Sequence, residues 1–368
     1  MRINRRRGLI ALAAAAIAAT IGIAGALDDG KSAGNGFDAA DLPLRQLAGQ
    51  RIVAGFPGED PPPAVRAMIR RGELAGVVLF SANFDDRGEA RRLIRRLQRI
   101  HRPRGLRDPL LVMVDQEGGQ VKRLSGPPTA SAAQMGSRGA DFSRKQGKAT
   151  GKSLSGAGFN VDLAPVLDVG RPGGAISEEG RSFGSSAPTV SGAGVAFADG
   201  LRDGGVAATA KHFPGLGAAE VNTDFGVEEI DLSQAALRTT DEAPFEAFND
   251  AKGQLVMMST AIYPAFSKRP AVFSRALATA ELRDRIGFGG VSISDALQSA
   301  AAQAFGGPAK VARAAARAGT DLLLFTDYRQ AAGAGAALRQ ALGDRDLRRA
   351  AFEPSVQRVL DLRAGISG

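Results

Sequence analysis

Residues 110–115, Leu-Leu-Val-Met-Val-Asp, show the pattern that decides the fold, a short apolar run that ends in a polar residue. The run lacks the alternation of a strand with one face in water, so it predicts a strand buried on both faces. Helices on both sides of a parallel sheet bury strands in this way. Eight such runs occur, at 51–55, 76–80, 110–115, 159–165, 206–211, 255–259, 290–295 and 321–325.

Segments with a helical pattern separate these runs. They lie at 61–71, 87–100, 141–156, 189–202, 243–250, 275–286 and 308–318. Regular alternation of strand and helix predicts parallel pairing with right-handed crossovers, and eight units favour a closed α/β barrel, the (β/α)8 TIM barrel, as one catalytic domain. The alternative is an open doubly wound sheet. Residues 54–58, Ala-Gly-Phe-Pro-Gly, do not fit the glycine-rich dinucleotide loop of that fold.

Polar side chains stand at the ends of several predicted strands. Asp115 ends the third run, Lys211 and His212 close the fifth, and Asp295 ends the seventh. Because the carboxyl ends of barrel strands meet on the face that carries the active site, we expect these side chains at one mouth. A single carboxylate at a strand end can instead cap the following helix.

The N-terminus has the pattern of an export segment. Four arginines precede an uncharged run over residues 8–27, and Ala24-Gly25-Ala26 offers the small residues that signal peptidase accepts. Residues 1–26 are therefore a cleaved signal peptide or an uncleaved anchor, in which case 8–27 would attach the protein to a membrane. Both alternatives predict an exported protein. We expect 27–42 to be a linker and 43–368 to form the barrel.

The composition excludes several kinds of chemistry. Without cysteine there is no disulfide, thiol nucleophile or zinc–thiolate site, and with only His101 and His212 there is no multi-histidine centre, so no metal or other cofactor is expected. Without the four N-terminal arginines the formal charge falls from +9 to +5. The remaining positive charge is densest at 87–107, which indicates a solvated outer helix or a weak docking surface for anionic wall polymers or lipid headgroups. A nucleic acid partner is not expected, because the chain has few aromatic residues.

Five motifs identify a family. They are Val-Asp-Gln-Glu-Gly-Gly-Gln-Val-Lys-Arg-Leu at 114–124, Leu-Ala-Pro-Val-Leu-Asp-Val at 163–169, Arg-Ser-Phe-Gly at 181–184, Lys-His-Phe-Pro-Gly at 211–215 and Ser-Ile-Ser-Asp-Ala-Leu at 292–297. Their order and spacing closely resemble glycoside hydrolase family 3, in particular its single-domain bacterial β-N-acetylhexosaminidases. The resemblance implies a retaining glycosidase. It also implies an amino-sugar substrate, and export fits the terminal N-acetylglucosamine of cell-wall glycans such as peptidoglycan fragments.

The resemblance also implies roles for single residues. Asp295 matches the catalytic nucleophile, which forms a covalent glycosyl-enzyme. The positions that bind the hydroxyls and N-acetyl region of the sugar correspond to Asp115, Arg123, Arg181, Lys211 and His212. The chemistry is suitable, since carboxylates accept hydrogen bonds from hydroxyls while lysine and arginine donate to sugar oxygens. Asp168 is expected to be structural.

The loop after Gly215 departs from the family pattern. Relatives usually carry a histidine in the next position and then an Asp-x-His pair whose histidine is the general acid/base. Here Leu216 takes the first position and 222–224 is Asn-Thr-Asp. One hypothesis is that Asp224, or Glu220 in the same loop, supplies the acid with a raised pKa. The other is that turnover is impaired and the protein is an exported wall-glycan binding or regulatory protein.

Overall fold

The computed structural model describes residues 38–366. The predicted signal or anchor segment, 1–26, and most of the predicted linker, 27–42, lie outside the described residues. The described part begins with the 3-10 helix η1 (Ala39–Asp41) and ends with α13 (Arg349–Gly365). Arg349 donates to the carbonyl oxygens of Ala40 and Leu42 at 2.6 and 3.0 Å, which holds the start of the body against its last helix. No helix within 38–366 has the length and hydrophobicity of a membrane span.

The eight predicted strands form one parallel sheet that closes into a barrel. The strand order is β11-β8-β7-β6-β3-β2-β1-β12. Leu322 beside β12 pairs in parallel with Ile293 of β11, which joins the two ends of the sheet. The strands are β1 (Ile52–Ala54), β2 (Gly76–Val78), β3 (Leu111–Val114), β6 (Val161–Asp162), β7 (Ala207–Phe213), β8 (Leu255–Met258), β11 (Val291–Ser294) and β12 (Leu323–Phe325). The TIM barrel prediction is confirmed.

Alternate residues of each strand face two different cores. In β3, Met113 belongs to a small cluster built almost entirely from strand residues, which fills the barrel interior. Its neighbours Val112 and Val114 belong to a larger cluster shared with the helices, such as Leu93 of α3. Because both faces are buried, every strand position favours an apolar side chain, which explains the unbroken apolar runs in the sequence.

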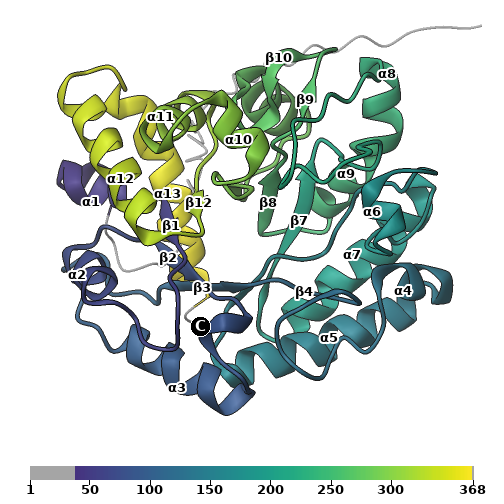
Figure 1. The fold of residues 1–368 in the computed structure, drawn as a ribbon, viewed down its shortest axis with the longest axis horizontal. Helices are drawn as coiled ribbons and strands as arrows, with labels where there is room; N and C mark the ends of the chain where they lie inside the picture. The colour runs from purple at the N-terminus through teal and green to yellow at the C-terminus, as the bar shows by residue number, and fades with distance from the viewer. Residues whose placement is uncertain (1–37, 367–368) are drawn as a thin grey trace, which may run out of the picture. The chain divides into compact units, whose positions relative to one another are not determined.

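Helices lie around the outside of the strands (Figure 1). The predicted helical segments correspond to α2, α3, α5, α7, α9, η5 and α11, of which η5 has π-type hydrogen bonding. The helices that cover the barrel or connect its strands are α1 (Leu44–Gly49), α2 (Pro63–Arg71), α3 (Arg87–Gln98), α4 (Ala132–Arg138), α5 (Ala140–Ala157), α6 (Ala175–Glu178), α7 (Ala187–Asp203), α8 (Gln234–Ala236), η3 (Leu237–Asp241), α9 (Ala243–Asp250), η5 (Ala276–Arg285), α10 (Ala300–Phe305), α11 (Pro308–Ala318) and α12 (Tyr328–Gly343). Short 3-10 turns are η2 (Ser81–Asn83) and η4 (Ala271–Phe273).

Two short antiparallel hairpins extend the loops after the strands. One pairs β4 (Gln116–Gly118) with β5 (Val121–Lys122), directly after Asp115. The other pairs β9 (Ile262–Tyr263) with β10 (Ser267–Pro270), after β8. These hairpins could not be predicted from the sequence, because strands of two to four residues are too short to show a period of their own.

Candidate active site

Seven of the residues singled out in the sequence line one cavity of about 410 Å³ at the carboxyl ends of the strands. The structure shows that these residues lie together, whereas the role of each remains a prediction. They come from distant parts of the chain, after β3, β5, α6 and β11, within β7, and in the loop that follows β7. The set is Asp115, Arg123, Arg181, Lys211, His212, Asp224 and Asp295.

A buried network of charges forms one wall of the cavity. Lys211 Nζ lies 2.8 Å from Asp115 Oδ1 and 2.7 Å from Glu117 Oε1. Arg181 donates to both oxygens of Glu117, at 2.8 and 2.9 Å, and its third nitrogen lies 2.9 Å from Glu179 Oε2. Each cation therefore contacts two carboxylates, which fixes the positions of its remaining donors.

The network keeps its charges despite burial. Burial alone would raise the pKa of Glu117, but the charges of Lys211 and Arg181 and their hydrogen bonds lower it to about 2. Burial would likewise lower the pKa of Lys211, but the carboxylates of Asp115 and Glu117 raise it above its ordinary value. The cavity wall is thus ionised at neutral pH, with donors and acceptors already oriented for a polar ligand.

His212 is oriented by Asp168, which is fully buried after β6. The Asp168 carboxylate lies 2.7 Å from His212 Nδ1 through Oδ2, and its Oδ1 accepts from the backbone N–H of His212 and of Leu216 at 3.0 and 2.7 Å. Because a carboxylate only accepts hydrogen bonds, it selects the form of the ring that carries a proton on Nδ1. Nε2 of the ring is the nitrogen left for the cavity that His212 lines.

Asp295 stands at the end of β11, which carries it to the cavity. Its backbone N–H donates to the Met258 carbonyl of β8 at 3.1 Å, and its Oδ1 accepts from the Ala296 N–H at 2.7 Å. No side chain within residues 38–366 hydrogen-bonds to its carboxylate. The carboxylate is half-buried and has one oxygen free for a ligand.

Asp224 lies in the same cavity, on the loop between β7 and α8. Its backbone N–H donates to Asn222 Oδ1 at 3.0 Å, and this hydrogen bond closes a tight turn. Two backbone hydrogen bonds fix the loop to the start of α10, from Ala300 N–H to the Asp224 carbonyl at 3.2 Å and from Ala301 N–H to the Thr223 carbonyl at 3.3 Å. Partial desolvation raises the pKa of the Asp224 carboxyl, and the charge of Asp295 raises it further.

Arg123, directly after β5, also lines the cavity. Its guanidinium lies 6.0 Å from the ring centre of Phe80, and its buried Nε has no hydrogen-bond partner among the described residues. Gln116 holds the backbone of this loop, since its Oε1 accepts from the N–H groups of Arg123 and Leu124 at 2.9 and 3.0 Å. Arg123 thus offers an unused donor at the cavity.

A model of the glycosyl hydrolase family 3 N-terminal domain matches residues 44–362. The chain belongs to glycoside hydrolase family 3. It is a glycosidase that hydrolyses O-glycosyl bonds and resembles β-N-acetylhexosaminidases. The family resemblance expected from the sequence is therefore confirmed.

Three family relatives illustrate the match. A protein of Arthroderma benhamiae, described as an uncharacterized secreted glycosyl hydrolase, is 35% identical over 336 residues, which cover 89% of this chain and 95% of that protein. The solved β-N-acetylhexosaminidase from Beutenbergia cavernae is 31% identical with a TM-score of 0.80, and the match covers 88% of this chain and 99% of that one. The solved family 3 β-N-acetylglucosaminidase from a Paenibacillus species is 30% identical with a TM-score of 0.83 over 89% of this chain. This chain spans 64% of that longer protein.

The loop that departs from the family 3 pattern is buried at its start and largely exposed further on. Leu216 is buried against the cavity and Thr223 is also buried. The adjoining Phe225 leaves 81% of its surface exposed at the rim. Residues 213–230 contain no histidine. Asp224 is the loop carboxylate that lines the cavity with Asp295, whereas Glu220, the other candidate acid, does not line it.

Two residues that shape the cavity were missed or undervalued in the sequence. Glu117 joins Lys211 to Arg181, yet it was not singled out. It follows Asp115 by two positions in an extended segment, a spacing that puts both side chains on the same face and could have identified it. Asp168 was expected to be structural. It is structural in that it touches no part of the cavity directly, but it is the residue that positions His212.

Proposed function

We propose that the protein is an exported, retaining β-N-acetylhexosaminidase that removes terminal N-acetylglucosamine or related sugars from cell-wall glycans. Asp295 attacks the anomeric carbon, and the glycosidic oxygen leaves as a covalent glycosyl-enzyme forms. Water then attacks the anomeric carbon and releases Asp295. The free carboxylate oxygen of Asp295 in the cavity supports this role.

Asp224 is the proposed general acid/base. It protonates the leaving oxygen in the first step and accepts a proton from water in the second, which restores its starting state. The observation that carries this proposal is that Asp224 and Asp295 line one cavity and that the charge of Asp295, together with desolvation, raises the pKa of Asp224. A raised pKa keeps the acid protonated at a higher pH, as the first step requires.

The remaining residues bind the sugar. Lys211 and Arg181 donate to ring oxygens or to the N-acetyl carbonyl, and Asp115 accepts from hydroxyls. His212, held by Asp168, and Arg123, with its unused Nε, supply further hydrogen bonds. The ionised network supports this assignment, because a rigid set of oriented donors positions a substrate at low entropic cost.

The export proposal rests on the N-terminal sequence and on one relative. Residues 1–26 are proposed to act as a signal peptide or anchor, with 27–42 as the linker and 43–368 as the catalytic barrel. The match of the family model to residues 44–362 supports the last boundary. The description of the Arthroderma benhamiae relative as secreted supports export. If the signal is not cleaved, 8–27 attach the protein to a membrane.

A second candidate function is that of a wall-glycan binding or regulatory protein with impaired turnover. The observation that favours it is Leu216, an apolar side chain buried where relatives carry a histidine, in a loop without histidine. The charged network would still bind sugars in this case. The two functions differ in whether a covalent glycosyl-enzyme forms and turns over.

The test is trapping of this intermediate. The protein is incubated with an activated aryl N-acetylglucosaminide or a 2-deoxy-2-fluoro glycoside, and peptide mass spectrometry locates the adduct. An activated leaving group needs little acid assistance, so trapping works even if the acid is absent. We expect an adduct on Asp295 that is released on dilution into natural substrate, and none in Asp295→Asn. A protein that binds glycan fragments without forming any adduct is the result that establishes the binding function instead.

The Asp224→Asn variant then tests the acid/base. Activity on unactivated substrates should fall by about 10²–10⁴-fold while activated substrates still form the adduct. Azide or formate should speed release of the trapped enzyme, because these nucleophiles need no general base. Glu220→Gln is the matched control in the same loop and should keep full activity. If Glu220→Gln shows the larger loss, Asp224 is not the acid.

A further inference from the structure

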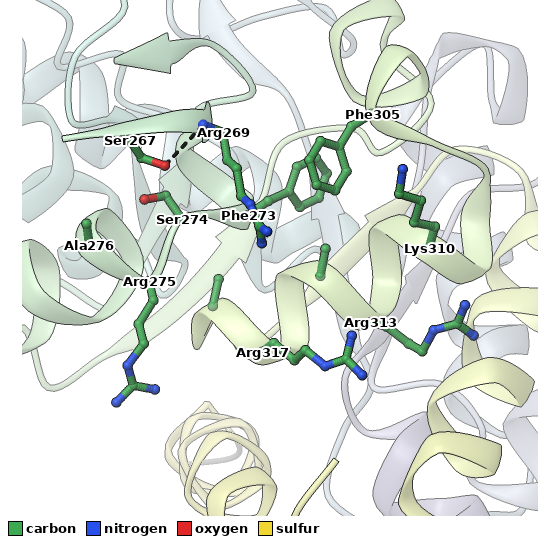
Figure 2. Close-up of a pocket in the computed structure, with 12 residues that line it drawn as sticks. Ser267, Arg269, Phe273, Ser274, Arg275, Ala276, Phe305, Lys310, Arg313 and Arg317 are labelled. Carbon is green, nitrogen blue, oxygen red and sulfur yellow. Dashed lines mark hydrogen bonds between the residues drawn. The ribbon is translucent and has the colours of Figure 1, made fainter. Parts of the chain in front are cut away.

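A second cavity, of about 480 Å³, lies on the outside of the barrel and shares no lining residue with the active site. One side is formed by β10 and by the segment that leads through η4 into η5. The other is formed by α11 and the end of α10. Figure 2 shows the side chains that line it. Its volume suits a ligand of the size of a phosphorylated metabolite.

Five cationic side chains line this second cavity and no acidic one does. Lys310, Arg313 and Arg317 follow one another along α11, at spacings that place them on one helix face, and Arg269 and Arg275 come from the opposite side (Figure 2). The chain contains no Asp or Glu over 262–280 or over 296–320. None of the ion pairs found within residues 38–366 involves these five residues, which are Arg269, Arg275, Lys310, Arg313 and Arg317.

The floor of the second cavity is apolar and contains one unused hydroxyl. Phe273 and Phe305 stack with ring centres 4.6 Å apart, and Lys310 Nζ lies 5.0 Å from the Phe305 ring centre. Ser274 is 2% exposed, and its Oγ has no hydrogen-bond partner among the described residues. A buried hydroxyl without a partner is costly and is rarely left so in a folded protein. A ligand in the cavity would satisfy it.

Like charges around one hollow repel each other, and no ion pair within residues 38–366 neutralises them. All but Arg313 are exposed, so solvent screens part of this repulsion and leaves these side chains open to a ligand. A single carboxylate carries one negative charge, whereas a phosphate ester carries about −1.5 to −2 at neutral pH and accepts bidentate hydrogen bonds from arginine. Two phosphates therefore match five cations better than one carboxylate does. A recessed cavity also suits a molecule in solution more than the flat surface of a bilayer.

We propose that this second cavity is a binding site for a soluble ligand that carries two or more phosphate groups. The guanidinium groups and Lys310 hold the phosphates, Ser274 donates one hydrogen bond, and the Phe273–Phe305 stack supports the apolar part of the ligand. The site is independent of the catalytic residues and does not rest on the function proposed above.

Titration calorimetry of the full chain with sodium tripolyphosphate tests the proposal. We expect saturable binding of one equivalent, with an affinity that falls steeply between low and high salt. Binding should be unchanged in Arg123→Gln, which removes a cation from the active-site cavity only. Absence of binding overturns the proposal, as does loss of binding in Arg123→Gln, which would place the probe in the active site. Binding to phosphatidylglycerol vesicles without binding to tripolyphosphate would assign the surface to a membrane and also overturn it.

Two variants locate the site. The double variant Arg313→Gln/Arg317→Gln should weaken tripolyphosphate binding at least tenfold, and Ser274→Ala should weaken it about fivefold without lowering the thermal midpoint, since its hydroxyl has no partner to lose. Arg91→Gln/Arg95→Gln on α3 is the matched control, because it removes the same charge from another exposed helix. If this control weakens binding as much as the α11 variant, the interaction depends on net charge alone and the proposed site is wrong.

Discussion

The Asp168 carboxylate holds both the ring and the backbone of His212, at 2.7 and 3.0 Å. The two contacts fix where the imidazole lies and which nitrogen faces the cavity. His212 therefore has its orientation before any ligand arrives, and the residue that provides it is fully buried. This relationship predicts that Asp168 affects catalysis without touching the substrate.

Asp168→Asn should lower kcat/KM by roughly 5- to 150-fold, the equivalent of one buried hydrogen bond of about 1–3 kcal/mol. The Asn oxygen can still accept from the two backbone N–H groups, but the Asn NH2 group that then faces Nδ1 cannot accept a hydrogen bond from it. The His212 ring should then no longer be held with its proton on Nδ1, and this change should appear as a shift of its imidazole resonances in NMR spectra. Asp168→Glu, which keeps the acceptor, should recover part of the activity. An unchanged histidine spectrum alongside a loss of activity would show that Asp168 acts through the fold alone.

Glu117→Gln should destabilise the protein by about 3–5 kcal/mol and raise KM. Glu117 is buried between Lys211 and Arg181, so the substitution leaves buried cations with insufficient negative charge. Chemical unfolding measures the first effect and steady-state kinetics the second. Asp60→Asn is the control, since it breaks an exposed ion pair with Arg96 and should cost less than about 1 kcal/mol. Equal costs for the two variants would contradict a buried network.

Asp162 at the end of β6 predicts a pH dependence of stability. Its Oδ1 accepts from the Gln116 N–H at 3.0 Å, its Oδ2 has no partner in the described chain, and burial raises its pKa from 3.8 to about 8. Between these values the folded state keeps a proton that the unfolded state has released. The stability it contributes is therefore complete below pH 3.8 and is lost as the pH rises toward 8, by at most about 1.4 kcal/mol per pH unit.

Asp162→Asn removes this titration and keeps the contact with Gln116. The difference in unfolding free energy between wild type and variant should thus move in favour of the variant as the pH rises from 5 to 8. Urea unfolding at several pH values measures it. A difference that stays constant over this range would show that Asp162 is already ionised in the folded protein.

The raised pKa of Asp224 predicts the basic limb of the activity profile. Loss of its proton removes the acid, so kcat/KM for unactivated substrates should fall as the pH rises through a value above the ordinary 3.8 of aspartate. The limb should be absent for aryl glycosides with good leaving groups and absent in Asp224→Asn. A basic limb that persists in Asp224→Asn would mean that another group is the acid.

Gly136 on α4 lies against the segment that carries Arg181. A β-carbon at this position would lie 1.6 Å from the Phe183 carbonyl oxygen, so Gly136→Ala must displace the 181–184 segment. We expect a loss of about 1–3 kcal/mol in stability and a higher KM. Gly192→Ala on α7 is the control, since open space surrounds its added carbon and alanine should stabilise the helix by up to about 1 kcal/mol. A Gly136→Ala variant with normal stability would show that this contact is not tight.

The barrel could be predicted because every strand is buried on both faces and therefore needs apolar side chains along its whole length. Residues such as Val112, Met113 and Val114 must all be apolar when one core lies inside the sheet and another outside it. Helices such as α9 were predicted with their observed bounds, 243–250, because their apolar period is clear. The gathering of Asp115, Lys211, His212 and Asp295 at one cavity followed from the fold, since the carboxyl ends of parallel strands meet. The other cavity residues were predicted from the family motifs.

Side-chain contacts between distant segments could not be predicted in the same way. The bidentate pairing of Glu117 with Arg181 depends on how the loop after α6 turns back over the barrel, and no local pattern encodes it. Likewise, Arg275 and Arg313 lie in separate helical segments, and they line one cavity only because η5 and α11 pack together. Asp224 lies at the edge of the cavity and is exposed, and two backbone hydrogen bonds from α10 to residues 223 and 224 hold its loop there, which composition cannot reveal.

Phe225 has a consequence for inhibitor design. An exposed aromatic ring stands at the rim of a cavity that holds two carboxylates, Asp224 and Asp295. A sugar mimic with a basic nitrogen and a flat apolar substituent would pair its charge with the carboxylates while the substituent covers the ring. A neutral imidazole in this loop, as in the usual family pattern, would attract the protonated nitrogen less than the carboxylate of Asp224 does. Asp224, in a loop where the usual family pattern has a histidine, thus offers a means of selective inhibition.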